Sequence, residues 1–175
     1  MKAPTLTTEQ YQLRPFKESD AALWQVWDID PAVQAHMPEP TNAPQTLSAH
    51  LQYQAECESE IDGYYWSIET PTGLTIGTIA LTDINDHHQL AEIGIVIGDK
   101  NYWGKGVATQ VIPAVVDFAF SKLGVVRISA LVEKENVAMA KVLEKSGFLR
   151  DGTFSSARVK NGKRIDVLHY GLVHT

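Results

Sequence analysis

The sequence predicts an α+β fold, with a mixed, mostly antiparallel central sheet built around a βαβ core. Residues 64–97 contain three alternating apolar segments separated by two turns, which is typical of antiparallel strands. Residues 92–132 pass from a strand through a long amphipathic helix into another strand, the pattern of a βαβ unit. The dipeptide Asn161-Gly162 lies between two further apolar segments and predicts a β-hairpin.

The first third of the chain predicts one strand and two helices. Residues 1–10 are polar and predict a loose lead-in, and residues 11–16 predict a strand. Ser19 is a favourable N-cap for a helix that ends near Asp28. A second helix is expected over residues 45–60. The stretch between the helices is expected to be a loop because it contains Pro31, Pro38, Pro40 and Pro44.

The middle of the chain predicts three antiparallel strands, over residues 64–69, 74–81 and 89–97. The second of the two turns between them covers residues 83–88 and contains His87 and His88. Because this pair has no third ligand at metal-like spacing, no metal site is predicted.

The last third predicts helices alternating with strands. A helix is expected over residues 104–122, although Pro113 inside it should kink it at a cost of about 3 kcal/mol. The remaining predicted elements are a strand (126–132), a helix capped by Asn136 and ended by Gly147, and the two hairpin strands (148–159 and 164–173).

The composition predicts one domain over residues 1–175. The chain is 44% hydrophobic and 21% charged, as expected for a globular domain with one core. Its net charge of -6 argues against a nucleic-acid partner and favours a cationic one. No apolar run approaches the ~20 residues of a membrane span. The single cysteine, Cys57, is expected to be a buried apolar residue and excludes an internal disulfide, which fits the cytoplasm.

The turn Gly104-Lys105-Gly106, between the central strand and its helix, predicts a site for a phosphorylated cofactor. Glycine lets the backbone approach a ligand, and the first N–H groups of a helix attract phosphate. Two common phosphate loops do not match, because Val107 replaces the Ser or Thr of one and Thr109 the third glycine of the other. The alternative is a plain helix start with a flexible turn.

Two segments resemble the GNAT N-acetyltransferase superfamily, in particular the branch with ribosomal-protein N-terminal and small-amine acetyltransferases. The first is Glu-Ile-Gly-Ile-Val-Ile-Gly-Asp-Lys-Asn-Tyr-Trp-Gly-Lys-Gly at residues 92–106, and the second runs from Asn136 to Phe148. Asn101 departs from the family's loop pattern, which has Gln or Arg there. The resemblance implies an acyl-CoA N-acyltransferase-like fold with a cofactor-binding βαβ core, and acetyl-CoA as the cosubstrate.

The same resemblance implies where acetyl-CoA binds. The pantetheine arm is expected along Ile95, Val96 and Ile97, in a splay between the central strand and the next one. Asn136 is expected to contact the cofactor, to cap its helix, or both. The pyrophosphate is expected on the N–H groups of the loop residues Tyr102, Trp103, Gly104, Lys105, Gly106, Val107 and Ala108.

Glu92 is the candidate general base. Period two places it on the same face as Gly94 and Val96, beside the expected thioester. A carboxylate in an apolar site has a raised pKa and can accept the proton of an amine, often through water. The alternatives are a surface carboxylate or a structural partner of Arg127.

The sequence offers no clear proton donor for the departing CoA thiolate. Relatives place a Ser or a Tyr where this chain has Met139 and Leu143, and Tyr170 on the last strand is the remaining suggestion. The acceptor is expected to lie under the first two helices, where Trp24 and Trp27 form core or pocket wall. In the loop between these helices His36, Glu39 and Asn42 either touch the acceptor or are solvated.

The predicted function is transfer of an acetyl group from acetyl-CoA directly to a primary amine. The acceptor is a small molecule or a peptide, namely a protein N-terminus, a polyamine, an amino acid or an amino sugar. One alternative is a non-catalytic acyl-CoA-binding or interaction module on the same fold. A plain nucleotide-binding domain is disfavoured by the two mismatched loops. The sequence leaves the oligomeric state open, including a dimer formed through the final hairpin.

Overall fold

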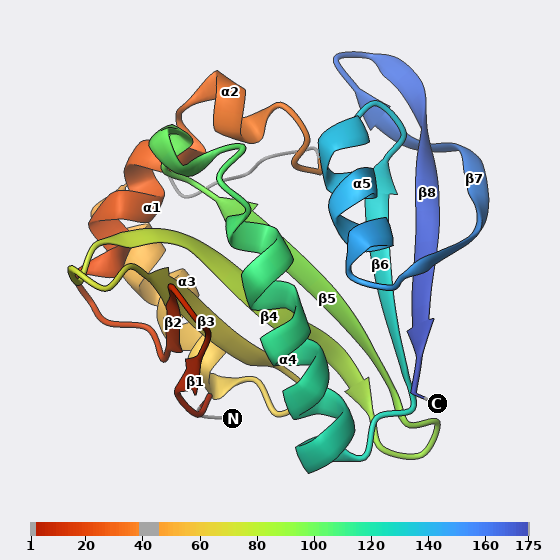
Figure 1. Cartoon of the computed structure of the whole chain (residues 1–175). Coiled ribbons are helices and arrows are strands. Elements are labelled where there is room, and N and C mark those ends of the chain that lie inside the picture. Colours follow the sequence, from red (N-terminus) through yellow and green to blue (C-terminus); the bar gives the residue numbers. More distant parts are fainter. Residues whose placement is uncertain (1–2, 39–45, 175) are drawn as a thin grey trace.

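A computed structural model describes residues 3–38 and 46–174 of the chain. The described residues form an eight-stranded sheet in the order β1-β2-β3-β4-β5-β6-β8-β7 (Figure 1). The β5–β6 pair is parallel, and the other neighbouring strands are antiparallel. The strands are β1 (Leu6–Thr7), β2 (Gln12–Arg14), β3 (Tyr64–Glu69), β4 (Thr75–Asn85), β5 (Leu90–Ile97), β6 (Arg127–Glu133), β7 (Leu149–Lys160) and β8 (Lys163–Val173).

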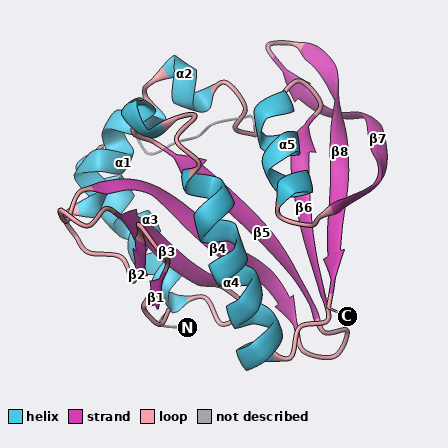
Figure 2. Cartoon of the chain, viewed as in Figure 1, coloured by secondary structure: helices cyan, strands magenta, loops and turns pink. Residues whose placement is uncertain are grey.

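Helices cover the sheet and fill the connections between its strands (Figure 2). They are α1 (Asp20–Asp28), α2 (Pro31–Gln34), α3 (Leu47–Ser59), the 3-10 helix η1 (Lys100–Tyr102), α4 (Val107–Leu123) and α5 (Val137–Lys145). None of the helices in the described part of the chain is long and apolar enough to cross a membrane. The predicted mixed, mostly antiparallel sheet with a βαβ unit, β5–α4–β6, is confirmed.

The core lies between the sheet and α4. The apolar face of α4, including Val111 and Val115, is fully buried against the strands. Ile93 of β5 points into the same core, whereas Val96 packs on the other side with the tryptophans of α1. Strand β5 therefore has one core face and one face toward α1, as its period-two pattern predicts.

Three sequence predictions for the N-terminal part were wrong. Residues 1–10 contain a short strand, β1, which pairs with β2. The loop after α1 contains α2, which starts with Pro31 at its first position and is capped by the Asp30 side chain, a typical use of proline. Ser19 precedes α1 but makes no side-chain cap, because its backbone is already helical and its hydroxyl is misplaced for capping.

The later predictions were closer to the structure. Strand β4 extends to Asn85, so the turn that follows it is shorter than predicted. Helix α4 runs on past Pro113, which lies on its exposed side. Gly124 and Gly147 both have positive φ angles beyond helix ends, and Asn161 and Gly162 have the two positive φ angles of the expected hairpin turn.

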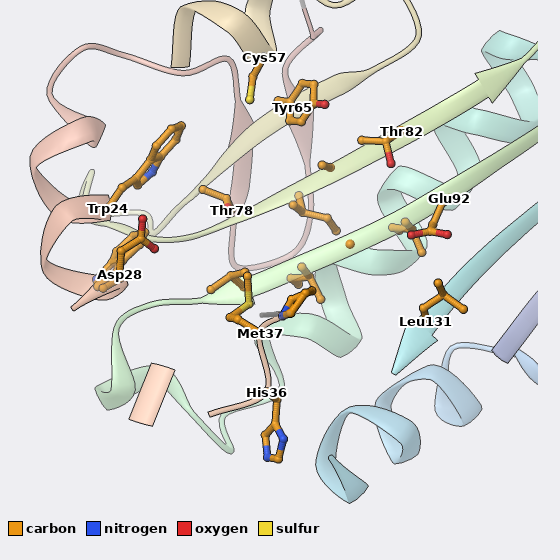
Figure 3. A pocket seen from close by; sticks show the side chains of 18 of the residues that line it. Trp24, Asp28, His36, Met37, Cys57, Tyr65, Thr78, Thr82, Glu92 and Leu131 are labelled. Carbon is orange, nitrogen blue, oxygen red and sulfur yellow. The ribbon is translucent and has the colours of Figure 1, made fainter. Parts of the chain in front are cut away.

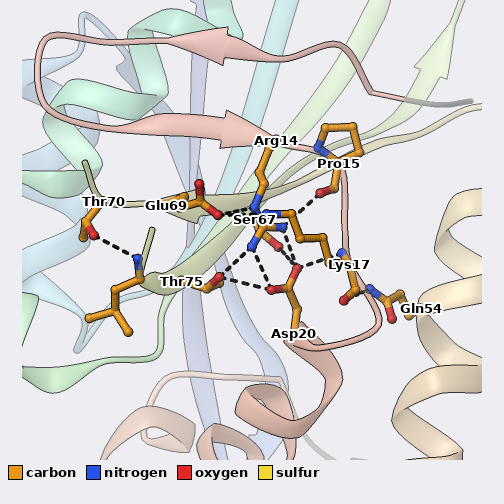
Figure 4. Close-up of polar contacts among 10 residues, drawn as sticks. Arg14, Pro15, Lys17, Asp20, Gln54, Ser67, Glu69, Thr70 and Thr75 are labelled. Atoms are coloured by element: carbon orange, nitrogen blue, oxygen red, sulfur yellow. Dashed lines mark hydrogen bonds and ion pairs between the residues drawn. The ribbon is translucent and has the colours of Figure 1, made fainter. Parts of the chain in front are cut away.

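A buried polar cluster joins α1 to the N-terminal half of the sheet (Figure 4). The Arg14 guanidinium donates to both carboxylate oxygens of Asp20, at 2.8 and 2.9 Å. It also donates to the carboxylate of Glu69 and to the hydroxyl of Thr75. Ser67 donates to Asp20 at 2.6 Å. One arginine thereby connects β2, α1, β3 and β4.

Candidate active site

The two parallel strands of the βαβ unit separate soon after they pair. Hydrogen-bonded register between β5 and β6 covers only Leu90–Glu92 and Arg127–Ser129. Beyond these residues the strands diverge, as Figure 1 shows. Among the described residues, the edge of residues 93–97 that faces β6 has no strand partner there, so its backbone groups are available to an extended ligand. This is the splay that the family resemblance implies.

A cavity of about 950 Å³ opens at this divergence. Its walls come from α1, α3, β3, β4, β5 and β6, with the residues after α2 and the start of α5 closing it. In Figure 3, Trp24 and Asp28 of α1 stand at one end, and Glu92 and Leu131 on the separating strands stand at the other. The cavity therefore connects the separated strands with the aromatic residues of α1.

Glu92 lies on the cavity wall, as the sequence predicts. Its side chain is half-buried and makes no hydrogen bond or ion pair with any described residue. The alternative role as a partner of Arg127 was wrong, because Arg127 bonds to Asp151 instead.

The surroundings of Glu92 favour its protonated form. Burial raises the pKa of Glu92, and the neighbouring Asp83 carboxylate raises it further. The positive charge of Arg158 and the nearby His169 act in the opposite direction without cancelling the rise. A carboxylate with a raised pKa is a stronger base than an ordinary one, which suits proton abstraction.

The three β5 residues predicted to hold pantetheine do not all reach the cavity. Ile95 and Val96 line it. Ile97 packs against the core, and its carbonyl accepts a hydrogen bond from the Trp103 indole at 2.7 Å. Trp103 therefore fixes the loop to the end of β5.

The glycine loop continues from β5 into α4. Gly104 and Gly106 have φ angles of 71° and 76°, and a Cβ at either would meet no atom of the described residues within 4 Å. Within the described residues, the N–H groups of Gly104, Gly106, Val107 and Ala108 have no hydrogen-bond acceptor. These open glycines and free donors at a helix start fit a pyrophosphate.

The other predicted loop residues are partly engaged within the loop itself. The N–H groups of Tyr102, Trp103 and Lys105 donate to the carbonyls of Asp99, Lys100 and Tyr102. The ammonium group of Lys105 lies 5.2 Å from the centre of the Tyr102 ring. The loop is thus stabilised internally while its second half keeps free donors.

The start of α5 also reaches the cavity. Asn136 caps this helix by accepting the Met139 N–H at 3.1 Å, which confirms the predicted cap, and it lines the cavity as well. Met139 is a cavity residue, whereas Leu143 is fully buried in the core. Tyr170 is buried away from the cavity and donates to Glu144, so it is no candidate for thiolate protonation.

Trp24 and Trp27, predicted as core or pocket wall, are both. Both are more than nine-tenths buried and both line the cavity. His36 also lines the cavity, with its Nδ1 3.4 Å from a Glu133 oxygen. The predictions for Glu39 and Asn42 fall outside the described residues.

Several cavity residues carried no local signal in the sequence. Asp28 comes from the last position of α1, and its carboxylate lies 3.0 Å from the buried His50 ring. Tyr53 and Tyr65 come from α3 and β3, and Arg158 from β7. These residues are far apart in the chain, so only the tertiary fold brings them together.

Cys57 lines the cavity but is unsuited to act as a nucleophile. Burial raises the pKa of its thiol to about 11, so the thiol stays protonated at neutral pH. This agrees with its predicted role as a buried apolar residue. The structure therefore assigns Cys57 no nucleophilic role.

Comparisons with known proteins agree with this geometry. Residues 11–149 match the family described as acetyltransferase (GNAT) domain. The chain is 32% identical to an uncharacterized N-acetyltransferase, YoaA, of Bacillus subtilis, over 97% of each protein.

Solved structures show the same fold. RimJ of Mycobacterium smegmatis, in complex with CoA-disulfide, superimposes with a TM-score of 0.88 at 20% identity, over 99% of this chain and 90% of that one. The spermidine N-acetyltransferase of Vibrio cholerae, in complex with CoA and spermine, gives 0.84 at 22% identity, over 94% and 95%. With its separated strands, its glycine loop and the matching family domain, the chain belongs to the GNAT family of N-acetyltransferases, which use acetyl-CoA.

Proposed function

We propose that this N-acetyltransferase moves the acetyl group of acetyl-CoA directly to a primary amine, with Glu92 as the general base. One observation carries the proposal: a half-buried carboxylate, unpaired among the described residues, faces the cavity at the point where β5 and β6 separate. An alkyl amine has a pKa near ~10.4 and is protonated at neutral pH, so it needs a base before it can react.

The chemistry assigned to Glu92 is proton acceptance, directly or through one water. Acetyl-CoA, when bound, would supply the thioester carbonyl for attack by the amine nitrogen, and the CoA thiolate would be the leaving group. Holding the amine and the thioester in one cavity makes the encounter effectively intramolecular.

The residues proposed to hold acetyl-CoA are those whose backbone groups lack hydrogen-bond partners among the described residues, together with Asn136. The free edge of Ile95 and Val96, with Asn136 across the opening, would bind the pantetheine arm. The free N–H groups of Gly104, Gly106, Val107 and Ala108 would bind the pyrophosphate, with the Lys105 side chain nearby to add a positive charge.

The proposed acceptor site runs from the aromatic end of the cavity to Glu92 (Figure 3). Phe16, Trp24 and Tyr65 form a continuous aromatic group at the aromatic end, with the Phe16 ring centre 4.5 Å from that of Trp24 and 6.1 Å from that of Tyr65. Aromatic faces attract ammonium groups, and the carboxylates of Asp28 at this end and of Glu92 at the other end add negative charge. These features support a small-molecule or peptide amine, as does the Vibrio cholerae spermidine N-acetyltransferase of the same fold, whose solved structure contains spermine.

The test is the variant Glu92→Gln. We expect kcat to fall at least 100-fold, because a positioned base contributes on the order of 10²–10⁴ in rate, while the dissociation constant of acetyl-CoA stays unchanged. In the wild type, kcat/KM should rise with pH through the raised pKa of Glu92, above the usual range of a glutamate, and the variant should lose this step. The exposed Glu58 on α3 supplies the control Glu58→Gln, which should change neither quantity.

An unchanged kcat in Glu92→Gln would remove Glu92 from the mechanism. If the wild type binds acetyl-CoA but acetylates none of a broad panel of amines, the chain is a non-catalytic acyl-CoA-binding module. Met139 on the cavity wall favours this second candidate, because its side chain cannot donate a proton to a thiolate.

A further inference from the structure

Arg158 is a positively charged residue of the cavity wall that forms no ion pair or hydrogen bond among the described residues. It is half-buried on β7. Apart from Glu92, the described carboxylates of the cavity have partners. Glu133 is bonded to Lys160 at 2.8 Å, and the Asp28 carboxylate lies 3.0 Å from His50. An unpaired guanidinium in a partly desolvated cavity is costly unless a ligand uses it.

The backbone around Arg158 is shaped by a bulge in β7. Phe154 pairs with Val167 and Arg158 with Ile165, so three β7 residues face the single residue Asp166. Ser156, in the middle of the bulge, has a φ of 54°, which a residue with a side chain rarely adopts. Bulges next to functional sites commonly redirect a side chain, and here the strand turns to present Arg158 to the cavity.

Several contacts hold the bulge in place. The Ser156 N–H donates to Asp166 at 3.0 Å, and Arg164 donates to the Ser156 carbonyl at 3.1 Å. Lys134 bonds to the other Asp166 oxygen at 2.9 Å. Residues of β8 and the residue after β6 therefore hold the bulge in one conformation. This conformation positions Arg158 at the cavity.

Arg158 and Glu92 present opposite charges to the same end of the cavity. The charge of Arg158 is close enough to act on the Glu92 carboxylate, yet the two side chains form no ion pair. A ligand between them would satisfy both only if it carried a positive and a negative group. The planar guanidinium matches the oxygens of a carboxylate or a phosphate with two parallel hydrogen bonds.

Building on the proposed function, we propose that the acceptor is a primary amine that also carries an anionic oxygen group, a carboxylate or a phosphate. Arg158 holds this anionic group while the amine faces Glu92. A polyamine would place a second cation against Arg158, where like charges repel. Amino acids and aminoalkyl phosphates meet the requirement, whereas polyamines and simple amines do not.

Matched ligand pairs test the proposal: glycine against glycinamide, and O-phosphoethanolamine against ethanolamine, with spermidine as the polyamine. Binding to the enzyme–CoA complex is measured by calorimetry, and kcat/KM is measured per unprotonated amine. In the wild type we expect the anionic member of at least one pair to be preferred about 10-fold or more. In Arg158→Gln the preference should fall to about 1 while the neutral amines change little.

Arg150→Gln is the matched control, because Arg150 is an exposed arginine on the same strand and outside the cavity. It should keep the wild-type preference. The proposal would be overturned if the wild type preferred spermidine or the neutral members of the pairs. It would also be overturned if Arg158→Gln lost affinity and kcat/KM equally for both members of each pair.

The calorimetric measurement distinguishes the acetyltransferase proposal from the Arg158 proposal. Anion-selective binding without turnover refutes the acetyltransferase proposal alone, and turnover without anion selectivity refutes the Arg158 proposal alone.

Discussion

Asp20 is a buried carboxylate at the centre of the polar cluster with Arg14. Its side chain is 1% exposed and it accepts hydrogen bonds from Arg14, Ser67 and the Lys17 N–H. Burial alone would raise the pKa of Asp20, but these hydrogen bonds together lower it. A lowered carboxyl pKa means that the folded state favours the ionised form, so this cluster contributes stability above about pH 4, the ordinary range of an aspartate.

The variant Asp20→Asn should therefore destabilise the protein by about 3 kcal/mol at pH 7, because it leaves the Arg14 charge buried and half-paired. The difference from the wild type should shrink as pH falls below about 4 and Asp20 itself becomes protonated through its lowered pKa. Urea unfolding at pH 7, 5 and 3 measures both effects. Asp117→Asn, on the exposed side of α4, is the control and should match the wild type at each pH. A difference that grows on acidification would contradict the assigned role.

At the scale of elements, the two ends of α4 provide a matched comparison. Gly106 precedes the helix with a φ of 76°, and Gly124 follows it with a φ of 68°. Alanine at either position has the same left-handed strain, of about 1 kcal/mol, and neither Cβ would come within 4 Å of an atom in residues 3–38 or 46–174. Only Gly106 belongs to the loop proposed to hold the pyrophosphate.

We expect Gly106→Ala and Gly124→Ala to lose similar stability in urea unfolding. Only Gly106→Ala should weaken CoA binding, by about 10-fold, because a strained backbone misdirects the free N–H groups. Calorimetric titration with CoA checks this. Equal affinities in the two variants would show that the loop does not bind the cofactor.

Elements with strong local signals could be predicted from the sequence, and elements made by tertiary contacts could not. The hairpin turn at Asn161-Gly162 and the cap at Asn136 depend on nearby residues alone, and both were predicted correctly. Strand β1 is two residues long and exists because β2 offers it an edge. The Asp-Pro start of α2 is a local signal for a helix, in a stretch whose prolines predict a loop.

The candidate site divides in the same way. Glu92 and the glycine loop lie in one continuous segment, so period two and the loop pattern were enough to select them. Arg158 lies 66 positions after Glu92, and the bulge that presents it depends on Asp166 of the next strand. No pattern within a single segment encodes such a contact.

At the scale of the whole molecule, the sheet is continuous, but β5 and β6 separate over most of their length and leave a gap between them. Strands β1 to β5 form one side, and β6, β8 and β7 form the other, joined by three residue pairs of β5 and β6. A cofactor in the gap would add hydrogen bonds to both sides. Ligand binding to the folded state alone raises stability by about 2.7 kcal/mol at a hundred times the dissociation constant.

We therefore expect CoA to slow amide hydrogen exchange in residues 93–97 of β5 and to stabilise the facing residues 130–133 of β6, beyond the glycine loop. Residues 64–69 of β3 serve as the internal reference and should change only as much as global stability does. Protection confined to residues 104–109, with none along the separated strands, would show that CoA does not occupy the gap.

The strand order has a consequence for how the chain folds. Strand β8 follows β7 in the sequence yet lies between β6 and β7 in the sheet. During synthesis, β7 leaves the ribosome before β8, the strand with which it pairs. One edge of β6 also stays unpaired until β8 has been made. The C-terminal half of the sheet must then form in a single late step, in which β8 joins both neighbours, and a nascent chain that ends before β8 exposes two strand edges to other chains.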